Sequence, residues 1–127
     1  MPQTHFLEEW GAEADATGNL CLRQPVTQAL RTAVSEATSI MGGIDVLINN
    51  AQASASGVTI QDHTTEQFNL AMYSGLYATF YYMKACYPYL KETKGAIINF
   101  ASGAGLFGNY GQCSYAAAKE AIRGLSR

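Results

Sequence analysis

Tyr115 and Lys119 are the residues of this sequence whose types and spacing most clearly predict chemistry. They stand four positions apart, in Tyr-Ala-Ala-Ala-Lys, so on a helix they share one face and their polar ends can meet. A lysine ammonium beside a phenol favours the phenolate and lowers the tyrosine pKa from about 10 toward the working pH. The pair therefore predicts a tyrosine that acts as a general acid or base. The alternative interpretation is a solvated lysine beside a half-buried tyrosine.

Ser102 adds a hydroxyl 13 residues (115 − 102) before Tyr115. It follows the apolar run Gly95–Ala101, which predicts a buried strand, so it stands at the carboxyl end of that strand. From there its hydroxyl can donate to the carbonyl oxygen of a substrate that Tyr115 protonates. Ligands of parallel sheets bind at the carboxyl ends of strands, and the same rule nominates Asn49–Gln52.

Helices and strands alternate along the chain and would position these residues. Apolar positions at helical spacing predict a helix from Thr27 to Met41 that ends at Gly42 and Gly43. A capping box at Thr64–Gln67 predicts a long helix that ends at Pro88 and the Lys91–Lys94 segment. Its predicted core positions are Phe68, Met72, Leu76, Phe80 (or Thr79), Met83 and Tyr87.

A glycine-rich loop, Ser102–Gly111, leads to an alanine-rich helix that begins near Gln112. The runs Ile44–Ile48 and Gly95–Ala101 predict strands covered on both faces, with Cys21–Leu22 as a parallel neighbour. The order predicts an α/β fold with a parallel sheet, right-handed crossovers and helices on its faces. Residues 5–16 mix acidic and apolar residues and predict a short helix.

Composition excludes several classes of protein. Apolar residues make up 48% of the 127 and charged residues 14%, which predicts a globular chain. Eight basic and ten acidic side chains give a net charge of −2, which predicts neither a nucleic acid nor a membrane partner. Apolar runs stay far below the about 18 residues of a membrane span, so a cytoplasmic protein is expected.

Cysteine and histidine spacing predicts no metal site. Cys21, Cys86 and Cys113 lie far apart without a C-x-x-C pair and are interpreted as small core residues. His63 stands beside the predicted helix cap and is interpreted as a solvated residue, although it could carry protons.

Three blocks of sequence, in this order and spacing, carry a family resemblance. They are Ile44–Ala51, Gly95–Ser102 and Gly111–Lys119. Over roughly Val26 to Arg127 the chain resembles the short-chain dehydrogenase/reductases. The resemblance implies a Rossmann-like, doubly wound parallel sheet and an NAD or NADP cofactor.

The resemblance also implies roles for individual residues. Ser102 would polarise a substrate carbonyl, Tyr115 would donate or accept the proton, and Lys119 would bond the nicotinamide ribose. Tyr115 and Lys119 would thus both contact the cofactor. The turn Asn49-Asn50-Ala51 would line its adenosine side, with Asn49 also tying strands together. The implied activity interconverts a secondary alcohol and a ketone, and the implied partner is a small-molecule ketone or alcohol.

Three features depart from the family pattern. Gln52 stands where the family turn continues with Gly, which adds a side chain close to the cofactor. Gly75 precedes Leu76 where the family usually has an Asn, so the fourth catalytic side chain is expected to be absent. No G-x-x-x-G-x-G or G-x-G-x-x-G turn, which would hold the cofactor pyrophosphate, occurs between Met1 and Arg127.

The third departure bears on domain organisation. Residues 1–127 are expected to form a single partial domain, with a core over 21–127 and a first segment, 1–20, of no clear pattern. The sheet is expected to be incomplete, lacking the first βαβ unit with its glycine-rich loop and the C-terminal strands. Weak or absent cofactor binding follows, and the alternative function is a truncated or degenerate relative that serves as an interaction module.

A tyrosine row on the long helix predicts association between copies. Tyr73, Tyr77 and Tyr81 are spaced four residues apart and lie beside the predicted core stripe, so the helix is apolar on two faces. A buried helix or an oligomer interface would explain this, and the resemblance implies a homodimer or homotetramer through this helix.

Overall fold

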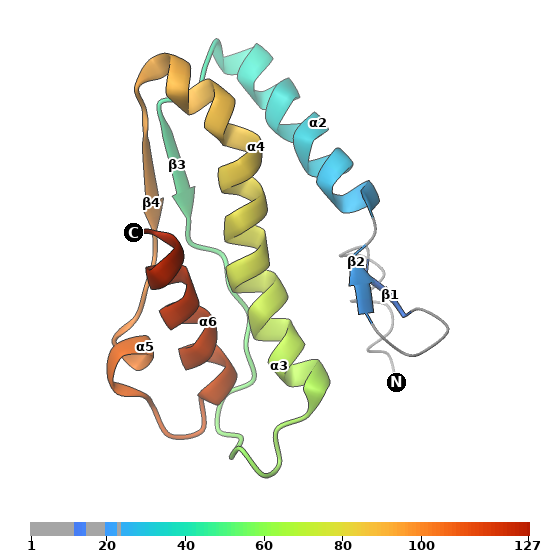
Figure 1. The fold of residues 1–127 in the computed structure, drawn as a ribbon, viewed down its shortest axis with the longest axis vertical. Coiled ribbons are helices and arrows are strands. Elements are labelled where there is room, and N and C mark those ends of the chain that lie inside the picture. Colours follow the sequence, from blue (N-terminus) through green and yellow to red (C-terminus); the bar gives the residue numbers. More distant parts are fainter. Residues whose placement is uncertain (1–11, 15–19, 23) are drawn as a thin grey trace. The chain divides into compact units, whose positions relative to one another are not determined.

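The computed structural model describes residues 12–14, 20–22 and 24–127 (Figure 1). The chain divides into two compact units, residues 1–43 and 44–127. No helix in the described ranges is both long and apolar enough to cross a membrane.

The first unit contains two short strands and one helix. Strand β1 (Ala12–Ala14) pairs antiparallel with β2 (Leu20–Leu22), and α2 (Gln24–Met41) follows. The helix is confirmed, and it ends at Gly42, whose φ of 80° favours glycine and whose N–H bonds the Thr38 carbonyl at 2.8 Å.

Two predictions for this unit are wrong. Strand β2, which contains Cys21–Leu22, pairs with β1 and is antiparallel, because a strand a few residues away in sequence needs no long crossover. The helix expected over 5–16 is contradicted at Ala12–Ala14, which form β1, and its other residues lie outside the described ranges.

The second unit is built on a parallel pair of strands, as predicted. Strand β3 (Val46–Asn49) and β4 (Ala96–Asn99) pair in the register Val46↔Ala96 to Asn49↔Asn99. The Asn49 amide donates to the side-chain oxygen of Asn99 at 2.8 Å, which confirms that Asn49 ties the strands together. Both strands therefore end at the same edge, where Asn50 and Phe100 follow.

The long helix is continuous from residue 65 to 93 but not uniform. It runs as α3 (Thr65–Ala71), a π-helical segment η1 (Met72–Tyr77) and α4 (Ala78–Thr93). The capping box is confirmed, since Thr64 accepts the Gln67 N–H and Gln67 accepts the Thr64 N–H. The prediction that Pro88 helps to end the helix is wrong, because Pro88 lies inside α4. The helix stops at Lys94, whose backbone is in the left-handed region and which belongs to the predicted Lys91–Lys94 end.

The predicted core stripe of this helix is also partly wrong. Phe68, Phe80 and Tyr87 are 39%, 43% and 59% exposed, whereas Thr79, predicted as the alternative to Phe80, is confirmed as buried. The buried positions carry mostly small residues: Ala71, Ser74, Gly75, Thr79, Cys86 and Leu90. The departure begins before the π turn, at Phe68 and Ala71, where helix α6 packs against α3 and η1 and small side chains let it approach closely.

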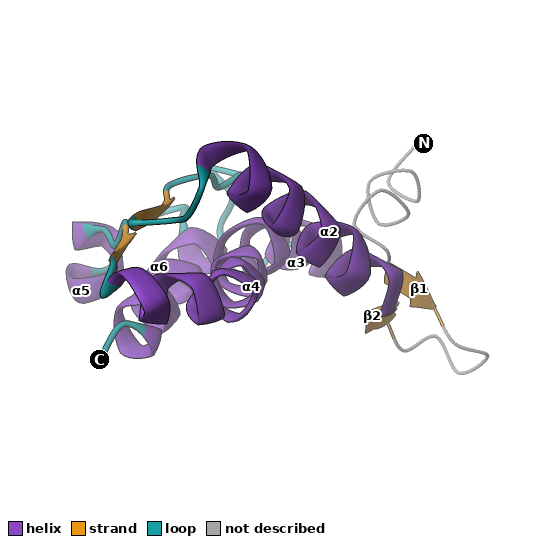
Figure 2. Cartoon of the chain, turned by 90° about the horizontal axis from the view of Figure 1, so that it is seen from above, coloured by secondary structure: helices purple, strands orange, loops and turns teal. Residues whose placement is uncertain are grey.

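The strands are covered on one face only within this unit, contrary to the prediction of two. Val46, Ile48 and Ile98 are 50%, 59% and 47% exposed, and exposed and half-buried positions alternate along both strands. Helix α4 packs against β3 and β4, and Figure 2 shows α4 and α6 to one side of the strands. Two strands with helices on one side leave the other set of side chains exposed.

After β4 the chain forms two helices that pack on each other. The segment predicted as a glycine-rich loop contains the short helix α5 (Gly103–Phe107), and α6 (Cys113–Leu125) follows where the alanine-rich helix was predicted. Of the cysteines with described side chains, Cys86 is buried, which raises the pKa of its thiol, and Cys113 is half-buried.

Candidate active site

Ser102 is the cap that joins β4 to α5. Its hydroxyl oxygen accepts the Ala104 N–H at 3.2 Å, so one turn of α5 is anchored by this side chain. The bond uses the oxygen as an acceptor and leaves the hydroxyl proton to donate to another group. Ser102 is half-buried, so a substrate oxygen can reach it.

Lys119 is a buried lysine on α6, with 5% of its surface exposed. Its ammonium donates to the Phe100 carbonyl oxygen at 2.7 Å, which links α6 to the end of β4. The same ammonium lies 5.7 Å from the centre of the Tyr115 ring, one helical turn away. The structure thus brings together the predicted Tyr–Lys pair and places a positive charge beside the phenol.

A close contact between α5 and α6 sets the position of Ser102 relative to Lys119. A Cβ atom on Gly105 would lie 2.8 Å from the Glu120 backbone nitrogen and 3.2 Å from the Lys119 carbonyl carbon. Ser102 stands between Phe100, which bonds the Lys119 ammonium, and Gly105, which contacts the Lys119 backbone. The chain is therefore held against Lys119 both before Ser102, at Phe100, and after it, at Gly105.

The loop after β3 holds the start of α6. The Gly111 carbonyl accepts the Gly57 and Val58 N–H groups at 2.9 and 3.3 Å. Gly111 has a φ of 71°, and a Cβ there would lie 2.9 Å from the Gly57 Cα, so this crossing requires glycine. The crossing fixes the N-terminal end of the helix that carries Tyr115.

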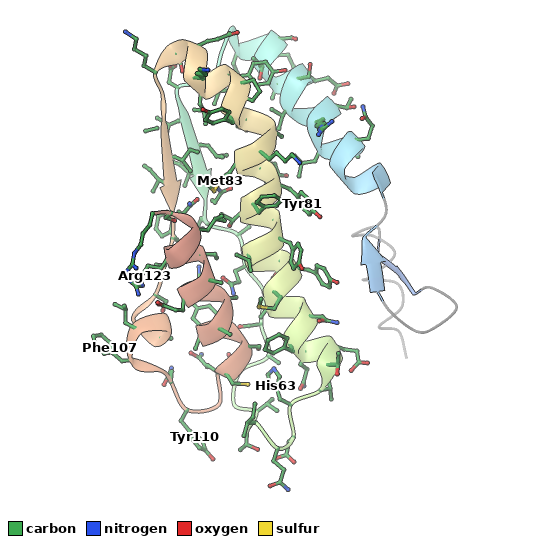
Figure 3. All side chains as sticks on the ribbon, in the orientation of Figure 1. His63, Tyr81, Met83, Phe107, Tyr110 and Arg123 are labelled. Carbon is green, nitrogen blue, oxygen red and sulfur yellow. The ribbon has the colours of Figure 1, made fainter. Side chains whose placement is uncertain are left out.

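His63 belongs to the same support, which contradicts its interpretation as a solvated residue. Its Nε2 lies 2.9 Å from the hydroxyl of Ser114, which is fully buried beside Tyr115 in the sequence, and its Nδ1 is buried. Figure 3 shows His63 below α6, close to the start of α3. No sequence signal marked this pair, because 51 residues separate its members.

The predicted cofactor turn lies at the carboxyl end of β3. The Asn49 amide is committed to Asn99, whereas Asn50 and Ala51 are exposed just beyond the strand. Lys119 offers three N–H donors and uses one on the Phe100 carbonyl. The structure therefore leaves the predicted adenosine-side turn exposed, and it leaves the predicted ribose ligand, the Lys119 ammonium, with donors to spare.

Two of the three departures from the family pattern, Gln52 and Gly75, are in contact with each other. A Cβ on Gly75 would lie 2.7 Å from the Gln52 amide carbon and 2.8 Å from its oxygen. The Gln52 side chain therefore turns toward the helix and fills the space beside Gly75.

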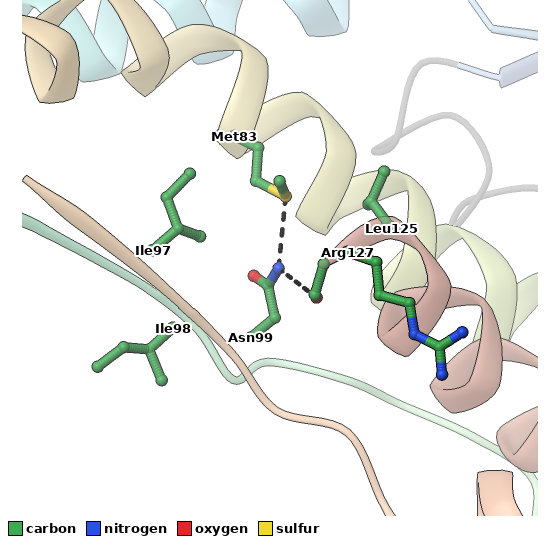
Figure 4. Close-up of a pocket in the computed structure, with 7 residues that line it drawn as sticks. Met83, Ile97, Ile98, Asn99, Leu125 and Arg127 are labelled. Atoms are coloured by element: carbon green, nitrogen blue, oxygen red, sulfur yellow. Dashed lines mark hydrogen bonds between the residues drawn. The ribbon is translucent and has the colours of Figure 1, made fainter.

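A pocket of about 460 Å³ lies away from these residues (Figure 4). It is lined by β4, α4 and the end of α6, and includes Met83, Asn99 and Arg127. There the Asn99 amide bonds the Ser126 hydroxyl at 2.9 Å and the Met83 sulfur at 3.5 Å. It contains none of Ser102, Tyr115 and Lys119, so it carries no argument for the predicted chemistry.

The predicted tyrosine row is formed on the long helix. The Tyr73 and Tyr77 rings have centroids 5.0 Å apart, and those of Tyr77 and Tyr81 are 6.2 Å apart. Burial and the neighbouring phenols raise the pKa values of Tyr73 and Tyr81. The association of copies through this row stays a prediction.

Comparison with known proteins identifies the family. A sequence model described as short chain dehydrogenase matches residues 5–127, nearly the whole chain. The chain belongs to the short-chain dehydrogenase family. Its parallel strand pair and packed helices are accordingly part of a Rossmann-type α/β fold.

Two curated relatives illustrate the family relationship. The chain is 69% identical over 98 residues to a 12alpha-hydroxysteroid dehydrogenase of Clostridium sp., covering 77% of this chain and 38% of that protein. It is 37% identical over 95 residues to a trans-4-hydroxycyclohexanecarboxylate dehydrogenase of Sinomonas cyclohexanicum, covering 75% of this chain and 36% of that protein. The chain thus spans well under half the length of these relatives.

Two solved structures that contain a nicotinamide cofactor have a fold similar to that of this chain. An NAD⁺-bound xylitol dehydrogenase has a TM-score of 0.73 and 27% identity, covering 78% of this chain and 38% of that one. The structure of ElxO with NADP bound has a TM-score of 0.73 and 28% identity, covering 78% and 40%. Nicotinamide cofactors are therefore bound in structures that share this arrangement of elements.

Proposed function

We propose that this chain carries the catalytic centre of an NAD(P)-dependent oxidoreductase that interconverts a secondary alcohol and a ketone. The observation that carries the proposal is the buried Lys119 ammonium, which lies beside the Tyr115 ring and bonds the end of the strand that leads to Ser102. Membership in the short-chain dehydrogenase family supports the same activity.

Each of the three side chains has one task in ketone reduction. Ser102 donates its hydroxyl proton in a hydrogen bond to the substrate carbonyl oxygen, which draws charge onto that oxygen. Tyr115 gives its phenolic proton to the oxygen and becomes a phenolate, which the Lys119 ammonium stabilises. The cofactor, when bound, supplies the hydride, and in alcohol oxidation Tyr115 takes the proton back.

We propose a hydroxysteroid as the substrate. The support is the 69% identity to a 12alpha-hydroxysteroid dehydrogenase over a segment that includes most of the second unit. A secondary alcohol on an alicyclic ring is also the substrate implied by the name of the Sinomonas relative. Ser102 and Tyr115 would then act on the ring hydroxyl.

A chimaera tests this activity. Residues 44–127 replace the matching segment of the Clostridium enzyme, and the reduced nicotinamide formed from a 12α-hydroxysteroid is followed by absorbance. We expect turnover within about tenfold of the parent, because the three side chains act from this segment. The parent enzyme is the control, and a folded chimaera that oxidises no secondary alcohol would refute the proposal.

The chain alone is expected to bind the cofactor weakly and to turn over nothing. Its sequence has no glycine-rich turn to hold the pyrophosphate, so only Asn50 and Ala51 on the adenosine side and Lys119 on the nicotinamide ribose remain to contact the cofactor. Titration of residues 1–127 with NADH and NADPH by calorimetry checks this, with the chimaera as the binding control. Micromolar binding by the monomeric chain would show that these residues suffice.

A further inference from the structure

Gln52 carries a buried amide whose polar atoms lack partners. Both Oε1 and Nε2 are shielded from solvent, and neither finds a hydrogen-bond partner among the residues that the structure describes. A buried amide without partners is destabilising, so such a group calls for an explanation. Bound water or a ligand group at this point would satisfy it.

The backbone around Gln52 is fixed rather than adaptable. The Ser74 hydroxyl accepts the N–H of the next residue, Ala53, at 2.9 Å, and lies 2.6 and 3.0 Å from the carbonyls of Leu70 and Ala53. This double contact fastens the turn after β3 to the π-helical segment η1. The Gln52 side chain is thereby directed against Gly75, the next residue of that segment.

The Gln52 amide occupies the space that a side chain at position 75 would need. A Cβ there would lie within 2.7 to 2.9 Å of three Gln52 amide atoms, a separation that real Cβ atoms do not show. Glycine in a helix interior is less favourable than alanine, so the sequence accepts a loss of helix stability at the position where this amide lies. The surrounding π turn, a feature common at functional sites, widens the helix at the same place.

The segment that the Gln52 amide contacts packs against the helix that carries the buried Lys119 ammonium. Segment η1 packs against α6, whose buried positions are Ser114, Ala118, Lys119 and Ile122. Gln52 also follows Asn49 by three residues, and the Asn49 carbonyl accepts the N–H of Phe100, whose own carbonyl accepts Lys119. The ammonium has donors to spare and the amide oxygen lacks a donor.

We propose that Gln52 is a positioning residue for Lys119: its amide fills the space beside Gly75 and, through bound water, holds the ammonium next to Tyr115. The catalytic consequence rests on the proposed function, but the contact itself does not. Water between two polar groups is nearly as favourable as a direct hydrogen bond. The departures at positions 52 and 75 are then linked. The family pattern has an asparagine amide on the helix at position 75, whereas this chain supplies an amide from the turn at position 52.

Nuclear magnetic resonance of the Lys119 ammonium tests the contact without any activity. The 127-residue chain is labelled with ¹⁵N-lysine, and the Lys119 signal is assigned by its loss in Lys119→Arg. A held, buried ammonium exchanges its protons slowly with water, and we expect Gln52→Met to speed this exchange at least about tenfold. Methionine keeps the length of the side chain and removes only the amide. Unchanged exchange would overturn the proposal.

Moving the amide from position 52 to position 75 tests whether the amide itself, rather than the packing of the two side chains, holds Lys119. An asparagine at position 75 would deliver an amide to nearly the same point, since the Cβ there meets the Gln52 amide carbon. We expect Gly75→Asn alone to lower the urea midpoint of unfolding, and Gln52→Gly with Gly75→Asn to restore both the midpoint and slow ammonium exchange. A double variant with fast exchange would show that packing alone pairs the two positions.

The chimaera adds the catalytic readout. Gln52→Met is expected to lower kcat about tenfold and to shift the pH profile of kcat, while KM for the steroid stays within about twofold. A merely structural role would leave the pH profile in place. If the wild-type chimaera is inactive while Gln52→Met still speeds ammonium exchange, the proposed function fails and the contact stands.

Discussion

Tyr115→Phe in the chimaera is expected to reduce ketone reduction by about 10²–10⁴-fold, the usual contribution of a general acid. The phenyl ring keeps its place 5.7 Å from the Lys119 ammonium, so packing is preserved and only the transferable proton is lost. Cofactor affinity should change by less than about twofold. Steady-state kinetics gives the first number, and calorimetric titration with NADPH and NADH gives the second.

Tyr110→Phe is the matched control for this variant. Tyr110 lies five residues earlier, is 88% exposed and points away from the unit in Figure 3. Removing its hydroxyl should leave turnover unchanged. Wild-type turnover by Tyr115→Phe would mean that another group transfers the proton, and the assignment of Ser102, Tyr115 and Lys119 would fail with it.

The sequence predicted the parts of the fold that depend on local patterns. The parallel pairing of β3 and β4 followed from two short apolar runs separated by a long helix, and the Thr64 cap followed from four residues. The pairing of Tyr115 with Lys119 also followed from spacing on one helix. Each of these rests on residues close in sequence or on a period that the chain itself displays.

The parts that the sequence did not predict depend on long-range packing. The π turn at 72–77 is not visible as a period, and the buried face of the long helix leaves out Phe68, Phe80 and Tyr87 in favour of smaller residues. The contact of His63 with Ser114 joins residues from two elements. Gln52 and Gly75 looked like two unrelated losses from a family pattern, because only the folded chain shows that one fills the space of the other.

Gly105→Ala is expected to destabilise the chain by about 1–3 kcal/mol, the usual cost of overpacking. The added Cβ would lie 2.8 Å from the Glu120 backbone nitrogen, and a helix backbone cannot turn aside as a side chain can. The gain in helix propensity from alanine, about 1 kcal/mol or less in so short a helix, offsets only part of this. Urea unfolding followed by circular dichroism measures the difference.

Gly103→Ala is the control, because it lies in the same helix and its Cβ would meet only the Phe107 side chain, at an ordinary 3.9 Å. It should leave the free energy of unfolding unchanged or slightly raised. In the chimaera, Gly105→Ala should also lower kcat, since moving α5 away from α6 moves Ser102 away from Tyr115 and Lys119. If the two alanine variants unfold at the same urea concentration, the contact of α5 with α6 does not set the position of Ser102.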